Sequence, residues 1–196
     1  MGYRTAAWVD PGKPPVCVDY LLRAPYRGYA EAVNVLSRRI LEMDRDCIAV
    51  VTGGDDIHPD TRTRVGIIAE SFRQRWPDLF GIMQPRGTGT GVPGGEAGSA
   101  VSPWMGRGWI SRAYGGKGPL WAEYPHYYVD TELRDVAMKL GVYWERPDLY
   151  QRHDHWATQD KQMPPHLAAA QKTERASAIL CCKRRDNGFP GHEPIP

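Results

Sequence analysis

The stretch IAVVTGGDD, residues Ile48–Asp56, decides the expected fold. The apolar, β-branched run over 47–52 is typical of a strand that helices cover on both faces. Two glycines end the run, and the adjacent carboxylates of Asp55 and Asp56 follow directly. Adjacent carboxylates repel each other unless a cation, a ligand or water lies between them. The stretch therefore predicts a central strand that ends at a binding site.

Strands and helices are predicted to alternate around this stretch, which indicates the α/β class. Apolar residues recur at helical spacing on both sides of it, and cap and stop residues mark the helix ends. The predicted elements are strands over 5–9, 16–22 and 47–52, a strand or extended loop over 150–157, and helices over 28–43, from 60 or 61, over 130–140 and over 164–185.

Composition is that of a soluble protein of one domain. The chain has 196 residues, and its 41% apolar and 24% charged shares are ordinary, so it can bury a real core. A net charge of +2 lacks the basic excess that would by itself announce a nucleic-acid binder. The four cysteines show no CxxC spacing, which favours reduced thiols. No apolar stretch approaches the roughly 20 residues of a membrane span, so we expect a cytoplasmic protein with no membrane partner.

Three parts of the chain are expected to behave differently. Residues 1–162 are predicted to form the main domain, 163–185 a C-terminal helix and 186–196 a disordered tail. Within the domain, glycine is so frequent over 86–108 that no regular element is expected there. That segment is either a lid over a cleft or a surface insertion, and the two tryptophans at its end, Trp104 and Trp109, favour the lid.

Three polar clusters could carry chemistry. Asp55 and Asp56 follow the predicted strand, where α/β sheets bind ligands and where oxygen donors suit Mg²⁺ or Mn²⁺; the alternative is a solvated turn. His153 and His155 in HDH share a face if the backbone is extended, and could join a metal or lie at the surface. The third cluster is YYVDTELRDVA, residues 127–137, whose carboxylates either cap a helix or supply a general base.

The order of these clusters resembles that in inverting glycosyltransferases with the GT-A fold. The likeness covers roughly residues 25–156 and is carried by YRGYAEAVN, IAVVTGGDDIHPD, YYVDTELRDVAMKLG and HDHW. It implies a Rossmann-like three-layer sandwich with a mostly parallel central sheet, whose N-terminal region is shortened here. It also implies transfer of a sugar from a nucleotide-diphosphate sugar to an acceptor hydroxyl, with Mn²⁺ or Mg²⁺ as cofactor.

The resemblance also implies roles for residues of the first two clusters and the helix before them. Gly28 and Asn34 would lie near the nucleotide. Asp56 would bind the metal together with His155 or His153, and Asp55 would contact the ribose or the sugar. The usual DxD pattern has a further carboxylate at position 54, where this chain has glycine.

A general base and phosphate contacts would come from later residues. By the same resemblance, Asp130 would deprotonate the acceptor hydroxyl. Glu132, in the same acidic cluster, is a further candidate for substrate contact. Arg107 and Arg112 flank GWI, which contains Trp109, and could add contacts to the donor. Analogy with compact viral transferases suggests a hydroxymethylated DNA base as one acceptor.

Two alternatives remain open. GGDD is similar to the GGDEF signature of diguanylate cyclases, but that motif lies on a hairpin, whereas residues 57–59 are expected to lead into a helix. The second alternative is a binding module for carbohydrate or nucleic acid, because seven Trp and ten Tyr could stack on sugars or bases.

Overall fold

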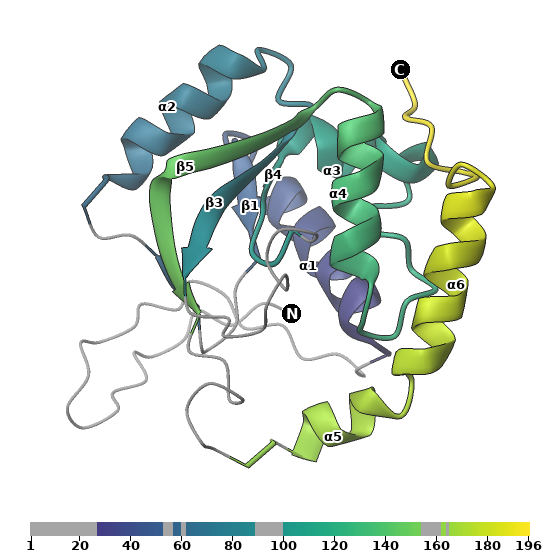
Figure 1. Cartoon of the computed structure of the whole chain (residues 1–196). Coiled ribbons are helices and arrows are strands. Elements are labelled where there is room, and N and C mark those ends of the chain that lie inside the picture. Colours follow the sequence, from purple (N-terminus) through teal and green to yellow (C-terminus); the bar gives the residue numbers. More distant parts are fainter. Residues whose placement is uncertain (1–26, 53–56, 60–61, 89–99, 154–161, 164) are drawn as a thin grey trace.

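The computed structural model describes residues 27–52, 57–59, 62–88, 100–153, 162–163 and 165–196. These residues form an α/β fold in which helices cover both faces of one sheet (Figure 1). The strands predicted over 5–9 and 16–22 lie outside the described residues, as do Asp55, Asp56 and His155. No described helix is long and apolar enough to cross a membrane.

The sheet is mixed, with strand order β1-β4-β3-β5-β2. Its strands are β1 (Ala49–Val51), β2 (Ile57–Pro59), β3 (Ile82–Thr88), β4 (Trp104–Gly106) and β5 (Tyr143–His153). Among the described strands only β3 and β5 pair in parallel, while the other three pairings are antiparallel. The α/β class is therefore confirmed, and the mostly parallel sheet is wrong.

The strand predicted to be central lies at an edge of the sheet. Within the described residues β1 pairs only with β4, and Val51 is 46% exposed. An apolar run predicts a strand, but it does not say how many neighbours that strand has. The predicted strand over 47–52 is confirmed over 49–51, and its central position is wrong.

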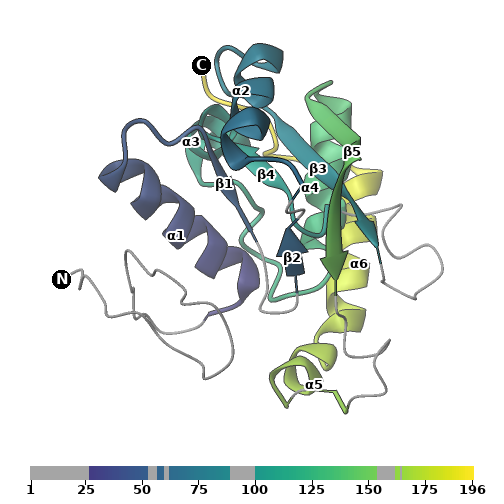
Figure 2. The ribbon, with the colours of Figure 1, turned by 90° about the vertical axis from the view of Figure 1, so that its left-hand side faces the viewer.

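Two apolar clusters show that the sheet lies between two helical layers. On one face Ile82 and Met105 pack with α1 (Tyr29–Met43), α3 (Arg107–Gly116) and α4 (Val129–Lys139). On the other face Met83 packs with α2 (Val65–Arg75). The residues of β3 alternate between the two clusters because successive strand side chains point to opposite faces. Figures 1 and 2 show α2 on the side of the sheet away from α4 and α6 (Glu174–Asp186).

The glycine-rich segment contains more regular structure than predicted. Residues 86–88 complete β3, β4 covers 104–106, and α3 starts at Arg107. A Cβ on Gly106 would lie 2.0 Å from the backbone oxygen of Leu79, and one on Gly108 would lie 2.4 Å from that of Asp78. These two glycines therefore allow close backbone packing and do not indicate a loop. The prediction of no regular element fails over 86–88 and 104–108.

The C-terminal region packs against the domain. The helix predicted over 164–185 is split into α5 (Pro165–Gln171) and α6. Beyond α6, Phe189 and His192 are buried, and the backbone N–H of Ile195 donates to the carbonyl of Arg112 at 3.0 Å. The prediction of a disordered tail over 186–196 is wrong, because its buried side chains complete the core beside α3.

Candidate functional site

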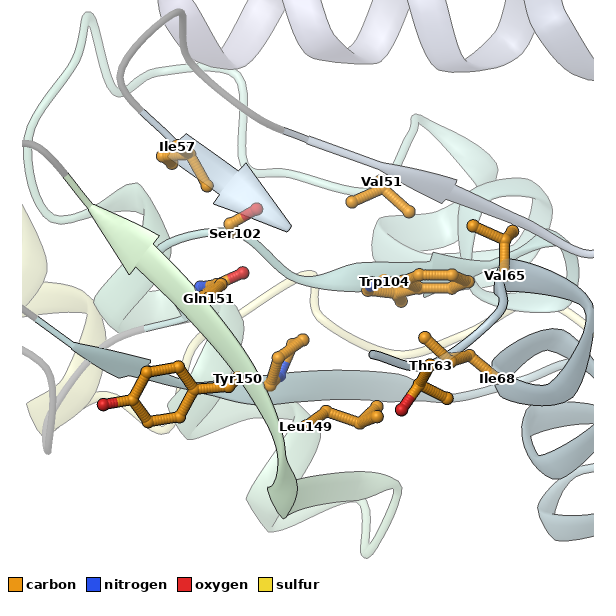
Figure 3. Close-up of a pocket in the computed structure, with 11 residues that line it drawn as sticks. Val51, Ile57, Thr63, Val65, Ile68, Ser102, Trp104, Leu149, Tyr150 and Gln151 are labelled. Carbon is orange, nitrogen blue, oxygen red and sulfur yellow. The ribbon is translucent and has the colours of Figure 1, made fainter. Parts of the chain in front are cut away.

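A cavity of about 180 Å³ lies on the α2 face of the sheet (Figure 3). Each strand and α2 contribute to its wall: Val51 comes from β1, Ile57 from β2, Trp104 from β4, Leu149 from β5 and Ile68 from α2. Figure 3 shows Val51 and Ile57 on one side of the cavity and Leu149 on the other. The cavity therefore exists because the strands curl around it.

The short connection between the edge strands explains this curl. Val51 and Ile57 belong to opposite edges of the sheet, yet six residue steps of chain can span only about 21 Å. A flat sheet of this width would already separate its edges by about 19 Å across the strands. The register adds an offset along them, because Val51 lies level with Met83, whereas Ile57 lies beyond the level of Thr88. Twisting and curling bring the two edges within reach of each other.

Few polar groups face the cavity. Thr63, Ser102 and Gln151 are the polar side chains of its lining, and the remaining lining is aliphatic or aromatic. The Ser102 hydroxyl donates to the backbone oxygen of Thr52, so its proton is already used. At one side the Arg62 guanidinium lies 5.4 Å from the centre of the Tyr150 ring, a cation–π contact. The cavity suits a mainly apolar ligand with few hydrogen-bonding groups.

The pairing of β2 with β5 brings together the regions around two predicted clusters. Ile57, the residue after Asp56, is the register partner of His153. The cyclase alternative was disfavoured because residues 57–59 were expected to lead into a helix, but these residues form the strand β2. β1 and β2 nevertheless lie at opposite edges of the sheet, so they form no hairpin of the kind that carries a GGDEF motif.

Asp130 lies at the start of α4, as predicted for the candidate base. One of its carboxylate oxygens, Oδ1, accepts the backbone N–H of Thr131 at 2.9 Å. Its backbone oxygen accepts the N–H of Ala100 at 3.3 Å, and Ala100 is two residues before Ser102 of the cavity wall. The start of α4 is thus tied to the chain segment that lines the cavity.

Glu132, expected to contact substrate, holds the core together. It is fully buried, and its Oε2 and Oε1 accept Nε and Nη2 of Arg184 at 2.7 and 2.8 Å. The Tyr124 hydroxyl donates to Oε2 at 2.8 Å. Burial, followed by the Glu132 charge, raises the pKa of Tyr124 far above its usual range. Both oxygens of Glu132 are used inside the protein, which gives it a structural role.

Gly28 and Asn34, expected near a nucleotide, both have structural explanations. A Cβ on Gly28, whose φ is +122°, would lie 2.9 Å from the carbonyl oxygen of Pro125. Asn34 is buried, donates from Nδ2 to the Leu120 oxygen at 2.8 Å and accepts the Leu120 N–H at 2.9 Å. These contacts fix α1 against the segment between α3 and α4.

Residues 107–112 are also tied into the fold. Arg107 donates to the backbone oxygens of Leu41 and Asp44, and so satisfies carbonyls at the end of α1. Arg112 pairs with Asp78 at 3.0 Å. The indole of Trp109 is fully buried and donates to the Pro119 oxygen at 3.0 Å, so it belongs to the core and not to an exposed lid.

Comparison with known proteins finds no matching family model, no similar curated protein and no similar solved structure. Within the described part of the chain no group of three or more His, Cys, Asp or Glu residues could hold a metal. The cavity lining of Ser102, Tyr150 and Gln151 was not predicted as a site. In β5, Leu149 and Gln151 are buried on either side of exposed Tyr150, whereas the residue order Leu-Tyr-Gln shows no apolar alternation, so no local sequence pattern indicated this site.

Proposed function

We propose that the protein is a metal-dependent inverting glycosyltransferase that uses a nucleotide-diphosphate sugar. The observation that carries this proposal is the antiparallel register of Ile57 with His153. It joins two of the three clusters on which the sequence resemblance depends, although they are far apart along the chain. The third cluster is linked to the same cavity through the Asp130–Ala100 backbone contact.

The register brings the segments that carry two of the clusters close to each other. Directly opposed residues of an antiparallel pair have Cα atoms about 4.5–5.5 Å apart, and Ile57 and His153 form such a pair. Asp56 is the residue before Ile57 in the sequence, and His155 follows His153 by two positions. The proximity of these two segments supports the proposal that Asp56 shares a cation with His153 or His155.

The donor set fits the proposed cofactor. Carboxylate oxygens and imidazole suit Mn²⁺, and carboxylates alone suit Mg²⁺. When bound, the ion would supply charge stabilisation for the diphosphate leaving group. Asp55 would orient the ribose or sugar. Asp130 would accept the proton of the acceptor hydroxyl as its oxygen attacks the anomeric carbon, which inverts the configuration.

The test is release of nucleoside diphosphate from a panel of nucleotide sugars with Mn²⁺. We expect at least one sugar to be turned over, and Asp56→Asn and Asp130→Asn each to lower the rate by about 100-fold or more. Asp186→Asn serves as the control because Asp186 is exposed at the end of α6, and its rate should match the parent protein. Equal rates in all four proteins would refute the proposal, and cyclic dinucleotide made from GTP alone would favour the cyclase.

A further inference from the structure

We propose that the cavity on the α2 face binds a single aromatic ring that carries the acceptor alcohol. This inference rests on the proposed function, because only a transferase gives the alcohol a role. The cavity itself is built entirely from described residues, and none of them belongs to the candidate metal ligands or the candidate base. It is thus a separate subsite for the second substrate.

The cavity volume sets the size of the ring. An engineered apolar cavity of about 150 Å³ in another protein holds one benzene molecule. The present cavity, at about 180 Å³, is slightly larger and would accommodate one ring with a small substituent. The cavity opens to solvent beside Val51 and Val65, so larger substituents would extend out of it.

The lining decides between an aromatic ring and a sugar ring of similar size. Val51, Ile57, Ile68 and Leu149 supply aliphatic wall, and the Trp104 indole supplies an aromatic face (Figure 3). A sugar would bring several hydroxyl groups against this wall, and each buried hydroxyl without a partner costs free energy. An aromatic ring with one alcohol needs few partners. The wall therefore favours the aromatic ring.

The position of the cavity explains how the alcohol would reach the reacting centre. Ile57 lines the cavity and is paired with His153, next to the candidate metal ligands. Ser102 lines it too, two residues after Ala100, which contacts the backbone of Asp130. Through Ser102 and Ile57, a ring seated against Trp104 would therefore border the segments that adjoin the start of α4 and the end of β5.

The probe is benzyl alcohol, titrated into the full chain without metal or donor, with binding followed by the methyl NMR signals of Ile57, Ile68 and Leu149. We expect a Kd on the order of 1 mM. Methyl glucoside should bind at least tenfold more weakly, because its hydroxyl groups would lie against the aliphatic wall. A hydroxymethylated pyrimidine nucleoside distinguishes the source of the ring: tighter binding than benzyl alcohol indicates a nucleoside acceptor, and weaker binding indicates a free aromatic alcohol.

Two matched variants locate the site. Val65 lines the cavity and is 67% exposed, so Val65→Trp can narrow the cavity without disturbing the core. Ile67 is 59% exposed on the same helix and lies outside the lining, so Ile67→Trp is the control. We expect Val65→Trp to weaken benzyl alcohol binding at least tenfold and Ile67→Trp to leave it unchanged.

The outcomes separate this inference from the proposed function. Three results would overturn the aromatic subsite even if sugar transfer is found. They are no binding of benzyl alcohol, equal binding to both Trp variants, and binding no tighter than that of methyl glucoside. Binding should persist in Asp56→Asn, because that residue is not part of the cavity lining. A normal titration of that variant, together with no turnover by the parent protein, would support ring binding in the cavity but would refute both the transferase and the acceptor role of the alcohol.

Discussion

Replacing Glu132 with glutamine should strongly destabilise the protein. Glu132 is fully buried, and its carboxylate is the partner of two donor nitrogens of Arg184. Arg184 comes from α6, so the pair joins the end of the chain to α4. Its guanidinium also lies 3.6 Å from the centre of the Trp121 ring. Glutamine keeps the shape and removes the charge, which leaves a buried cation with no counter-ion.

The expected magnitude follows from the burial of both partners. Removing one member of a buried ion pair costs about 3–5 kcal/mol, because the remaining charge stays desolvated. For a chain of this size that corresponds to a fall in Tm of roughly 10 °C. The matched control is Glu174→Gln, since Glu174 is exposed in the first turn of α6 and should change stability by less than about 0.5 kcal/mol.

Urea unfolding followed by circular dichroism measures the free energy of unfolding of each variant. A loss below about 1 kcal/mol for Glu132→Gln would refute the reasoning that the pair is desolvated and structural. The double variant Glu132→Leu with Arg184→Met should recover most of the loss, because it leaves no unpaired buried charge. Nucleotide-sugar affinity of folded Glu132→Gln should equal that of the parent protein, whereas a substrate contact at Glu132 would lower it.

Three further predictions concern the backbone, tyrosine ionisation and thiol reactivity. Gly28→Ala should destabilise the protein by about 1–3 kcal/mol, because Gly28 has a positive φ and the added Cβ would contact the Pro125 carbonyl. Gly66→Ala should stabilise it by about 0.5–1 kcal/mol, because Gly66 lies in α2 with open space around it. Thermal unfolding of the two variants measures both effects. Burial, followed by the Glu145 charge, raises the pKa of Tyr143 to about 12. The folded state then keeps a proton that the unfolded chain releases near pH 10. This contribution to stability is therefore complete below about pH 10 and is lost as the pH rises toward 12. In Tyr143→Phe, the free energy of unfolding should decrease less steeply between these pH values. Iodoacetamide should label exposed Cys182 well before buried Cys181, whose pKa burial raises, as peptide mass spectrometry would show.

Two helices, α1 and α4, were the most predictable part of the fold. α1 and α4 lie where the apolar periodicity placed them, and Gly141 follows α4 with a φ of +70° as the stop signal implied. These signals are local, because a helix satisfies its backbone within a few residues. Strand order is not local, so nothing in the run before Asp55 revealed that β1 would be an edge strand beside β4.

The site was harder to predict because polar residues carry the same local pattern in structural and functional roles. The local sequence around an acidic residue in the first turn of a helix is the same whether its carboxylate contacts a substrate or a buried cation. Glu132 has its cation in Arg184, 52 positions later, and Asn34 has its partner in Leu120, 86 positions later. Sequence spacing could not reveal either partner. The cavity was missed for the same reason, since its wall gathers one to three residues from each strand.

The strand order also determines when the proposed centre can assemble during synthesis. Ile57 is made early, whereas its partner His153 is made almost a hundred residues later. Such long-range pairing must pay a large loop-closure entropy and is slow to form. A nascent chain must therefore emerge through the end of β5 before β2 can pair with it. A truncated translation product that stops before that strand could not form the proposed cation site, however well its helices had formed.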